Sequence, residues 1–350
     1  MGALTLGTVA SFVRDLGGAC TSVVMGDELL VGGSHEGMVM CWSSTTGEKY
    51  WEADIDGPIS SISLGGGELF IASSSSISSL SVETGEILWQ SELEGSSDYV
   101  FRRGDVVWAC SSVYAIEVSD YVESTLWAFD RGGSLLNRWS FEEKCWFLGP
   151  HPLEGIVLGL GRPRCGYLRA TINEGAVHNE LSVDSPVTTG AVGPNGVLFG
   201  HSDGKISDIH GSSWPGVGES VRSLAIIGDA WAYGTEAGSV GGEEWREEFG
   251  GSIDAVLPKP GKRTTWVISW EDGTSIHCIN GPPGDLEIVH SSRIYSSFAQ
   301  EGAAALGDEN GQIFVIRGDF LERRILEGVP GDELDEHSAT LRERLRGLRN

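Results

Sequence analysis

The stretch LFIASSSSISSLSVETGEILWQSELEG, residues 69–95, contains the pattern that decides the fold. Apolar residues alternate with serines, as in a strand with one buried face, and a Thr-Gly turn then leads to a tryptophan. Trp89 is followed by Leu93 four residues later and by Gly95 six residues later. The same frame recurs three times, as Trp51, Ile55 and Gly57; as Trp245, Phe249 and Gly251; and as Phe12, Leu16 and Gly18.

This frame returns at a nearly constant interval. From Phe12 to Trp51 the step is 39 residues, and from Trp51 to Trp89 it is 38. Self-similarity with a period of about 20–50 residues is typical of a repeat architecture. A second motif, two glycines four residues apart after an apolar strand, recurs as GSHEG (33–37), GHSDG (200–204), GTEAG (234–238) and GDENG (307–311).

The second motif indicates a hairpin in each repeat unit. Asp-Gly and Asn-Gly pairs favour two-residue turns, because both turn positions need positive φ. A four-stranded sheet cannot bury both of its faces alone, but sheets stacked radially can. The sequence therefore predicts an all-β, eight-bladed β-propeller of four-stranded antiparallel sheets, with seven blades as the alternative. Its eight units begin near Thr21, Ser60, Asp98, Trp146, Val187, Val221, Ala255 and Ser297.

The recurring tryptophans predict how the ring packs and closes. Trp51, Trp89 and Trp245 are expected to lie largely buried between blades. Nine segments resemble their outer strand, counting the one at Phe12 and residues 320–326, but only eight hairpins exist. We therefore expect residues 8–16 to pair with the last blade and close the ring. The propeller then spans residues 1–329, and residues 330–350 form a separate segment.

Two stretches resemble a known family. Residues 69–93, with ETGEILW as the most recognisable part, resemble the repeat of PQQ-like, quinoprotein-type β-propellers. LLVGGSHEGMVMCWSSTTGEKYW, residues 29–51, resembles that repeat and also a WD40 repeat. The resemblance covers roughly residues 10–328 and implies a propeller fold. The third and fourth units, from Asp98 to Pro186, depart most, because they are longer and have poor turn motifs.

The C-terminal segment GDELDEHSATLRERLRGLRN, residues 331–350, changes in composition. Acids crowd its start and arginines its end, which complements a helix dipole. Four leucines, spaced by seven, four and three, share one face, which predicts an amphipathic helix over about 333–348, the only substantial helix in the chain. This helix either packs on the propeller or docks into a partner's groove. Its leucines are Leu334, Leu341, Leu345 and Leu348.

The charge is strongly unbalanced. Fifty acidic residues face 24 basic ones, so the formal net charge is −26, and only five of the basic residues are lysine. Acids spread over every unit favour a solvated surface adapted to high salt, which suggests a halophilic archaeal source. An acidic face for a basic partner is the alternative. The propeller has no basic stripe, so direct nucleic-acid binding is not expected, and high net charge favours a monomer.

The location expected for the protein is the cytoplasm. The N-terminus lacks a basic region followed by a continuous apolar core, so it does not read as a signal peptide. No apolar run approaches the ~20 residues of a membrane span, so no membrane association is expected. The six scattered cysteines are expected to be buried free thiols.

No motif in the chain predicts a catalytic, cofactor-binding or metal site. A quinone-dependent dehydrogenase, as the resemblance could imply, often carries a vicinal disulfide, and the chain has no Cys-Cys pair. The densest group of possible metal ligands is His201, Asp203, Asp208 and His210, but a turn at Asp203 places the two histidines too far apart to share a metal. The sequence thus favours a non-enzymatic protein- or peptide-binding scaffold. The alternative is an enzyme, a quinone-dependent dehydrogenase, hydrolase or lyase, with its site in the central funnel.

One face of the predicted ring should carry the hairpin turns and the connections between blades. A ring of carboxylates there could receive the arginines or lysines of a basic partner. Turns also favour acids for backbone reasons alone, so simple solvation is the alternative. The candidate partner-binding residues are Glu36, Asp203, Glu236, Asp272, Asp308 and Glu309, with His35 and His201 among them.

A salt titration tests the origin of the acidity. If the acids form a halophilic surface, KCl screens their mutual repulsion, and the melting temperature should rise steadily from dilute to molar KCl. Equal stability at both extremes would contradict a salt adaptation and favour a localised acidic binding face.

Overall fold

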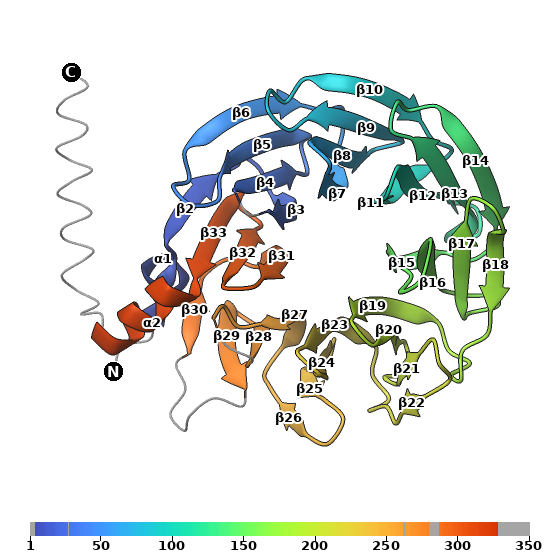
Figure 1. Ribbon diagram of the computed structural model, residues 1–350. Coiled ribbons are helices and arrows are strands. Elements are labelled where there is room, and N and C mark those ends of the chain that lie inside the picture. The colour runs from blue at the N-terminus through green and yellow to red at the C-terminus, as the bar shows by residue number, and fades with distance from the viewer. Residues whose placement is uncertain (1–3, 27, 262–263, 280–286, 328–350) are drawn as a thin grey trace.

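The computed structural model describes residues 4–26, 28–261, 264–279 and 287–327 of the chain. The strands of this part form eight antiparallel sheets arranged in a ring around a central axis (Figure 1). Seven sheets have four strands, and the seventh blade in chain order gains a fifth. The prediction of an eight-bladed β-propeller is confirmed, and the seven-bladed alternative is wrong.

Each blade runs from its innermost strand at the centre to its outermost strand at the rim. Blades 1 to 4 consist of β3 (Cys20–Met25), β4 (Leu29–Ser34), β5 (Met38–Ser43) and β6 (Lys49–Asp54); β7 (Ile59–Gly65), β8 (Glu68–Ser73), β9 (Ser76–Ser81) and β10 (Ile87–Glu92); β11 (Ser96–Arg103), β12 (Val106–Ala115), β13 (Asp120–Asp130) and β14 (Leu135–Phe141); and β15 (Cys145–Pro150), β16 (Ile156–Leu160), β17 (Tyr167–Thr171) and β18 (Gly175–Asn179).

The second half of the ring repeats this order. Blades 5 to 8 consist of β19 (Val187–Gly193), β20 (Gly196–His201), β21 (Ile206–Asp208) and β22 (Ser213–Trp214); β23 (Val221–Ile227), β24 (Ala230–Thr235), β25 (Ser239–Gly241) and β26 (Arg246–Glu248); β27 (Ser252–Pro258), β28 (Thr265–Trp270), β29 (Thr274–Ile279) and β30 (Ile288–His290), with β1 (Leu4–Thr5) added; and β31 (Ile294–Gln300), β32 (Ala303–Asp308), β33 (Gln312–Arg317) and β2 (Phe12–Asp15).

The two ends of the chain meet in the last blade. Strand β2, from the N-terminus, is the outermost strand of blade 8 and pairs antiparallel with β33, Phe12 opposite Val315. This is the pairing expected for residues 8–16. The segment before it also joins blade 7, because β1 pairs parallel with β30, Leu4 opposite Ile288. Residues 4–15 therefore hold both blade 7 and blade 8.

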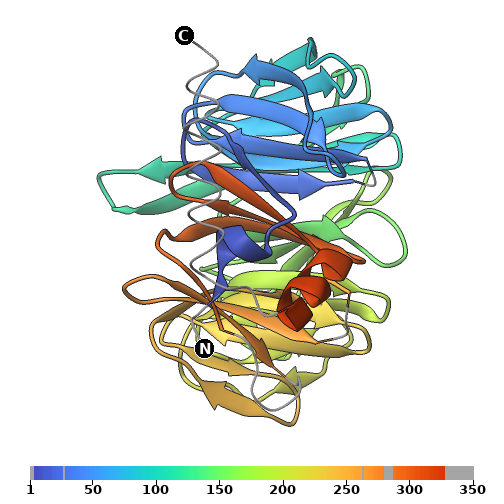
Figure 2. The same cartoon turned by 90° about the vertical axis from the view of Figure 1, so that its left-hand side faces the viewer.

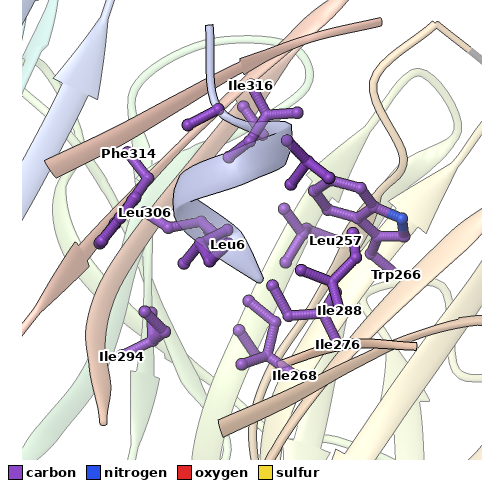
Figure 3. Close-up of a cluster of buried hydrophobic side chains, with 14 of the residues drawn as sticks. Leu6, Leu257, Trp266, Ile268, Ile276, Ile288, Ile294, Leu306, Phe314 and Ile316 are labelled. Atoms are coloured by element: carbon purple, nitrogen blue, oxygen red, sulfur yellow. The ribbon is translucent and has the colours of Figure 1, made fainter. Parts of the chain in front are cut away.

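A short helix between these two strands fills the joint between blades 7 and 8. Helix α1 (Leu6–Val9) buries Leu6 completely. Figure 3 shows Leu6 among Leu306, Phe314 and Ile316 of blade 8 and Trp266 and Ile288 of blade 7. Burying a leucine side chain contributes about 1.5–3 kcal/mol. The N-terminal segment thus adds apolar packing to the hydrogen bonds of its two strands.

The repeated tryptophan packs one blade against the next. Trp51, on the outermost strand of blade 1, lies over Gly85 in the turn before the outermost strand of blade 2. A methyl group at Gly85 would lie only 2.5 Å from the indole ring, and Gly85 has a φ of +75°. The indole N–H donates to the carbonyl of Val82, 2.7 Å away. The Thr-Gly turn and the tryptophan therefore recur together because they form one contact between neighbouring blades.

The same contact occurs at two further joints. Trp89 of blade 2 lies against Gly133 of blade 3 and donates to the carbonyl of Arg131 at 2.8 Å. Trp139 of blade 3 lies against Gly175 of blade 4. Where blade 8 meets blade 1, Arg14 takes the place of the indole and donates to the carbonyls of Gly47 and Thr46.

The expected burial of the three tryptophans is correct only for Trp51, whose exposed fraction is 7%. Trp89 and Trp245 are half-buried. Trp89 packs on the next blade as Trp51 does but keeps more of its surface in water, whereas Trp245 precedes the three-residue strand β26 and its indole lies beside Gly242 of its own blade.

The segment 320–326 corrects another expectation. It resembles an outer strand in sequence, but it lies in helix α2 (Gly318–Glu327). β2 already occupies the edge of β33, so no pairing position remains there for residues 320–326. A helix of ten residues therefore exists outside the C-terminal segment. The helix expected over 333–348, with Leu334, Leu341, Leu345 and Leu348, lies outside the described residues. Of the helices that the structure describes, none is long and apolar enough to cross a membrane.

A substitution series tests the packing of the tryptophans. Trp51→Ala should lower the free energy of unfolding by about 3–5 kcal/mol, because it removes a buried aromatic side chain and leaves a cavity. Trp89→Ala should cost less, since part of that indole is already in water. Tyr50→Ala, at the neighbouring exposed position, should change stability by less than about 0.5 kcal/mol. Denaturant unfolding monitored by circular dichroism measures all three, and a Trp51→Ala loss no larger than that of Tyr50→Ala would contradict this packing.

Candidate functional site

The upper face, defined here as the face that carries the turn between the second and third strands of each blade, carries the turns in which the six predicted acids lie. Glu36, Glu236 and Asp272 are exposed there, and Asp203 and Glu309 are half-exposed. These five come from blades 1, 5, 6, 7 and 8, so they occupy one continuous arc of the ring.

Asp308 does not belong to this surface, contrary to expectation. Its exposed fraction is 0%. One carboxylate oxygen accepts from Nε2 of His290 at 2.9 Å, and the other accepts from the backbone N–H groups of Asn310 and Gln312. The side chain therefore turns inward to hold its own hairpin turn, and it is not available to a partner.

Several of the other acids have local partners. Asp203 pairs with Lys205 at 2.7 Å, and although partial burial alone would raise its pKa, the contact with Lys205 lowers the pKa of Asp203. Glu236 lies 3.8 Å from Arg222, and Glu309 accepts a backbone hydrogen bond from Arg293. These contacts stabilise the turns themselves. Acids also occupy turns of the opposite face, such as Glu83 and Glu86, so charge alone does not distinguish the two faces.

The two histidines of the HSDGKISDIH stretch lie in different environments. His201 is fully buried, where Nδ1 bonds to the carbonyl of Ser185 at 2.9 Å and Nε2 to the hydroxyl of Ser207 at 2.8 Å. Burial lowers the pKa of His201, which favours the neutral ring. His210 is exposed. Within the part of the chain that the structure describes, no group of three or more His, Cys, Asp or Glu residues is placed to hold a metal ion.

The cysteines are free thiols, and five of the six are buried. Burial raises the pKa of Cys20 to about 11, because the thiolate would lose its hydration. The thiols therefore act as small apolar side chains of the core.

A long hairpin in blade 3 is the feature of the upper face that the sequence reasoning missed. Strands β12 and β13 have ten and eleven residues, and their hairpin extends beyond the rest of the ring (teal, Figure 2). Five of the sixteen large hydrophobic residues exposed in the described chain lie on it. With their exposed fractions they are Val113 (36%), Tyr114 (51%), Ile116 (81%), Val118 (64%) and Val122 (45%).

Aromatic contacts fix this hairpin against blade 4. The rings of Tyr114 and Tyr121 meet edge to face at 5.2 Å, and Tyr121 meets Trp146 in the same way at 6.2 Å. Trp146 is itself 41% exposed. The hydroxyl of Tyr99 donates to the carbonyl of Trp146 at 3.0 Å. The apolar tip is therefore presented on a supported base, with the exposed Trp146 beside it.

A buried lysine supports the same base. The ammonium of Lys144 bonds to Asp98 and to the hydroxyl of Ser112, and it lies 4.3 Å from the centre of the Tyr121 ring. Ser112 in turn donates to Asp98 at 2.8 Å. The lysine donates to the serine, which is the reverse of what a general base would do for a nucleophile. This network is consequently suited to holding the hairpin.

A groove runs along the upper face at the foot of the hairpin, between blades 2 and 3. Its volume is about 660 Å³, and its walls are mostly serine, with Pro58, Val113 and Tyr114. Ser74 and Ser75, from the serine run of the opening stretch, form part of the wall. Small hydroxyl side chains leave this groove open and can bond to a peptide backbone. The hairpin and the groove together are the candidate site.

Comparisons with known proteins agree with the fold. Residues 5–138 match a PQQ-repeat family model described as outer membrane protein assembly factor BamB. The resemblance to PQQ-like propeller repeats is thus confirmed for this part of the chain. The comparison with curated proteins gives no match.

Among solved structures, three similar propellers cover most of the chain. Sqt1 from Saccharomyces cerevisiae has 11% identity and a TM-score of 0.71, over 88% of this chain and 98% of that one. The computationally designed Ika8 protein has 16% identity and a TM-score of 0.68, over 87% and 98%. BamB from Moraxella catarrhalis has 14% identity and a TM-score of 0.67, over 87% and 97%. At such low identity these likenesses show the fold alone.

Proposed function

We propose that this chain, an eight-bladed β-propeller with PQQ-like repeats, is a non-enzymatic scaffold that binds another protein or peptide on its upper face. The observation that carries the proposal is the exposed apolar tip of the β12–β13 hairpin, with Trp146 beside it. Exposed large apolar side chains gathered on one element mark an interaction site more often than scattered single residues do.

The chemistry of the hairpin defines the kind of partner. Its tip offers aliphatic and aromatic side chains, which form the buried centre of protein interfaces. The acids Glu117, Asp120 and Glu123 surround that tip and are exposed. A partner that fits therefore has an apolar patch with a basic rim. The acids of blades 1 and 5 to 8, exposed or half-exposed, extend the negative field over the upper face and favour fast association with a basic protein; they are Glu36, Asp203, Glu236, Asp272 and Glu309.

The support of the hairpin also fits a binding role. Side chains that are already ordered lose less conformational entropy when a partner arrives. The ring of Tyr121 contacts both Tyr114 and Trp146, and the ammonium of Lys144 lies over the same ring. The matching family model is described as an assembly factor, a role that depends on protein partners and is consistent with the proposal. A cytoplasmic location and a monomeric state remain our predictions.

Substitutions on the hairpin test the proposal. The double substitution Ile116→Asp and Val118→Asp should reduce partner binding by at least about tenfold, because it places two charges in the apolar centre of the interface. Leu153→Asp is the matched control, since Leu153 is 82% exposed and lies in the turn between β15 and β16 on the opposite face. The measurement is affinity capture from the native host at its native salt, followed by titration of the captured protein.

The two variants distinguish a partner that binds at the hairpin from one that binds elsewhere on the protein. A partner retained by Leu153→Asp and lost by the hairpin variant supports the proposal. A partner lost only by Leu153→Asp, or retained equally by both variants, contradicts the assignment of the binding site to the hairpin.

A further inference from the structure

The joint between blades 5 and 6 departs from the packing seen between blades 1 and 2 and between blades 2 and 3. Trp51 and Trp89 each donate to a backbone carbonyl of the next blade and lie on a glycine. At this joint Trp214 instead donates to the carboxylate of Glu243, at 3.3 Å. The outermost strand that carries Trp214 has only two residues. The joint therefore stays open, and a pocket of about 200 Å³ remains beside the indole.

Two indoles form a corner of this pocket. Trp214 comes from β22 of blade 5, and Trp231 comes from β24 of blade 6. Their ring centres are 5.3 Å apart and the planes are inclined by 64°. Both side chains are half-exposed and line the cavity. A corner of this kind can contact a bound group with two ring faces or edges at once.

Three carboxylates line the same pocket, and none of its lining residues is basic. They are Asp208, Asp229 and Glu243. Asp208 is held in place, because one of its oxygens accepts from the backbone N–H groups of His210 and Ser212. Val197, Leu198 and Ile226 supply the apolar part of the wall. The pocket thus combines negative charge, aromatic rings and aliphatic surface.

This combination selects an organic cation. Aromatic rings attract cations through their quadrupole, and quaternary ammonium groups are the ligands that aromatic cages recognise best. The methyl groups of such a cation also pack well against aliphatic side chains, and nearby carboxylates balance its charge. A strongly hydrated metal ion would gain little from the indoles and the aliphatic wall. The three acids do not form a metal-ligand group among the described residues.

We propose that the pocket between blades 5 and 6 binds a small quaternary ammonium compound. The cation sits in the corner of Trp214 and Trp231, facing Asp208, Asp229 and Glu243. The volume of about 200 Å³ accommodates a trimethylammonium head with a short tail, so a small free molecule is the occupant. This site is independent of the hairpin on blade 3, and the proposed scaffold role can stand or fall without it.

Calorimetric titration of the full chain tests the site. Tetramethylammonium and choline chlorides are the probes, titrated at constant ionic strength with KCl as the blank. Both should bind with one site per chain. Glu243→Gln should weaken binding by about tenfold, because it removes a charge while an oxygen remains to accept from Trp214. Trp231→Leu should weaken binding by a similar factor.

Matched controls keep the result interpretable. Trp139→Leu makes the same substitution at a joint that is packed on Gly175, and it should leave the affinity unchanged. Circular dichroism and the melting temperature report whether each variant folds, and Glu243→Gln is expected to fold as the parent does. Absence of binding heat with both probes, or equal affinity in the parent and in Glu243→Gln, would overturn the proposal.

Titration with a peptide distinguishes a free ammonium compound from a methylated protein as the ligand of the pocket. A short peptide that contains trimethyl-lysine is titrated in the same buffer. Affinity no greater than that of choline supports a small free ligand. Much tighter binding of the peptide, abolished by Trp231→Leu, would overturn the choice of ligand and make the pocket a reader of methylated lysine.

Discussion

The pairing of β2 with β33 is the interaction on which the rest of the structure depends. Each blade contacts only its two neighbours, so an open row of blades would have two exposed ends. The strand that completes blade 8 comes from the N-terminus, which converts the row into a ring without free ends. Leu16, just after that strand, is buried together with Ile313 of blade 8 and Leu30 of blade 1. Hydrogen bonds and apolar packing therefore close the ring at the same place.

Within the closed ring, one repeated contact packs blades 1 to 4 against one another, and the two proposed sites lie where a blade departs from the repeat in strand length. An indole over a glycine turn leaves little open volume between blades. Blade 3 keeps that contact but lengthens its inner hairpin, which exposes apolar side chains such as Ile116 on the upper face. Blade 5 shortens its outer strands, and the joint beside Trp214 opens into a pocket. A rigid ring can tolerate both changes, since neither involves the closing strand.

The fold could be predicted from the sequence because its main contact, between an indole and a glycine turn, is encoded by a short motif that recurs along the chain. The spacing of tryptophan, apolar residue and glycine encodes the blade-to-blade packing, and the count of hairpins gives the number of blades. The strand expected over 320–326 was wrong, because pairing depends on whether an edge is free, and β2 already occupies it. Asp308 was misplaced for a similar reason. A turn acid can point outward or inward, and Asp308 points inward to accept from His290 and from backbone N–H groups of its own turn.

The candidate site was harder to predict than the fold. Residues 98–186 departed from the repeat and lacked a clear turn motif, but sequence alone did not show that Val113, Ile116 and Val118 would be exposed. Alternating apolar residues look the same in a core strand and in a projecting hairpin. A signal was present in the length of the two runs around Ser119, which exceeds that of the other inner strands. The pocket at Trp214 depends on contacts between two blades, which no single repeat reveals.

Native-state hydrogen exchange of the last blade is the most direct test of ring closure by the N-terminal strand. The account predicts that the slowest amides of β32 and β33 exchange only through global unfolding, with the same opening free energy as those of β8 and β9 in blade 2. Exchange of β31–β33 through a separate opening of much lower free energy, while blade 2 stays protected, would contradict it. Such a result would mean that the N-terminal strand does not hold the ring closed.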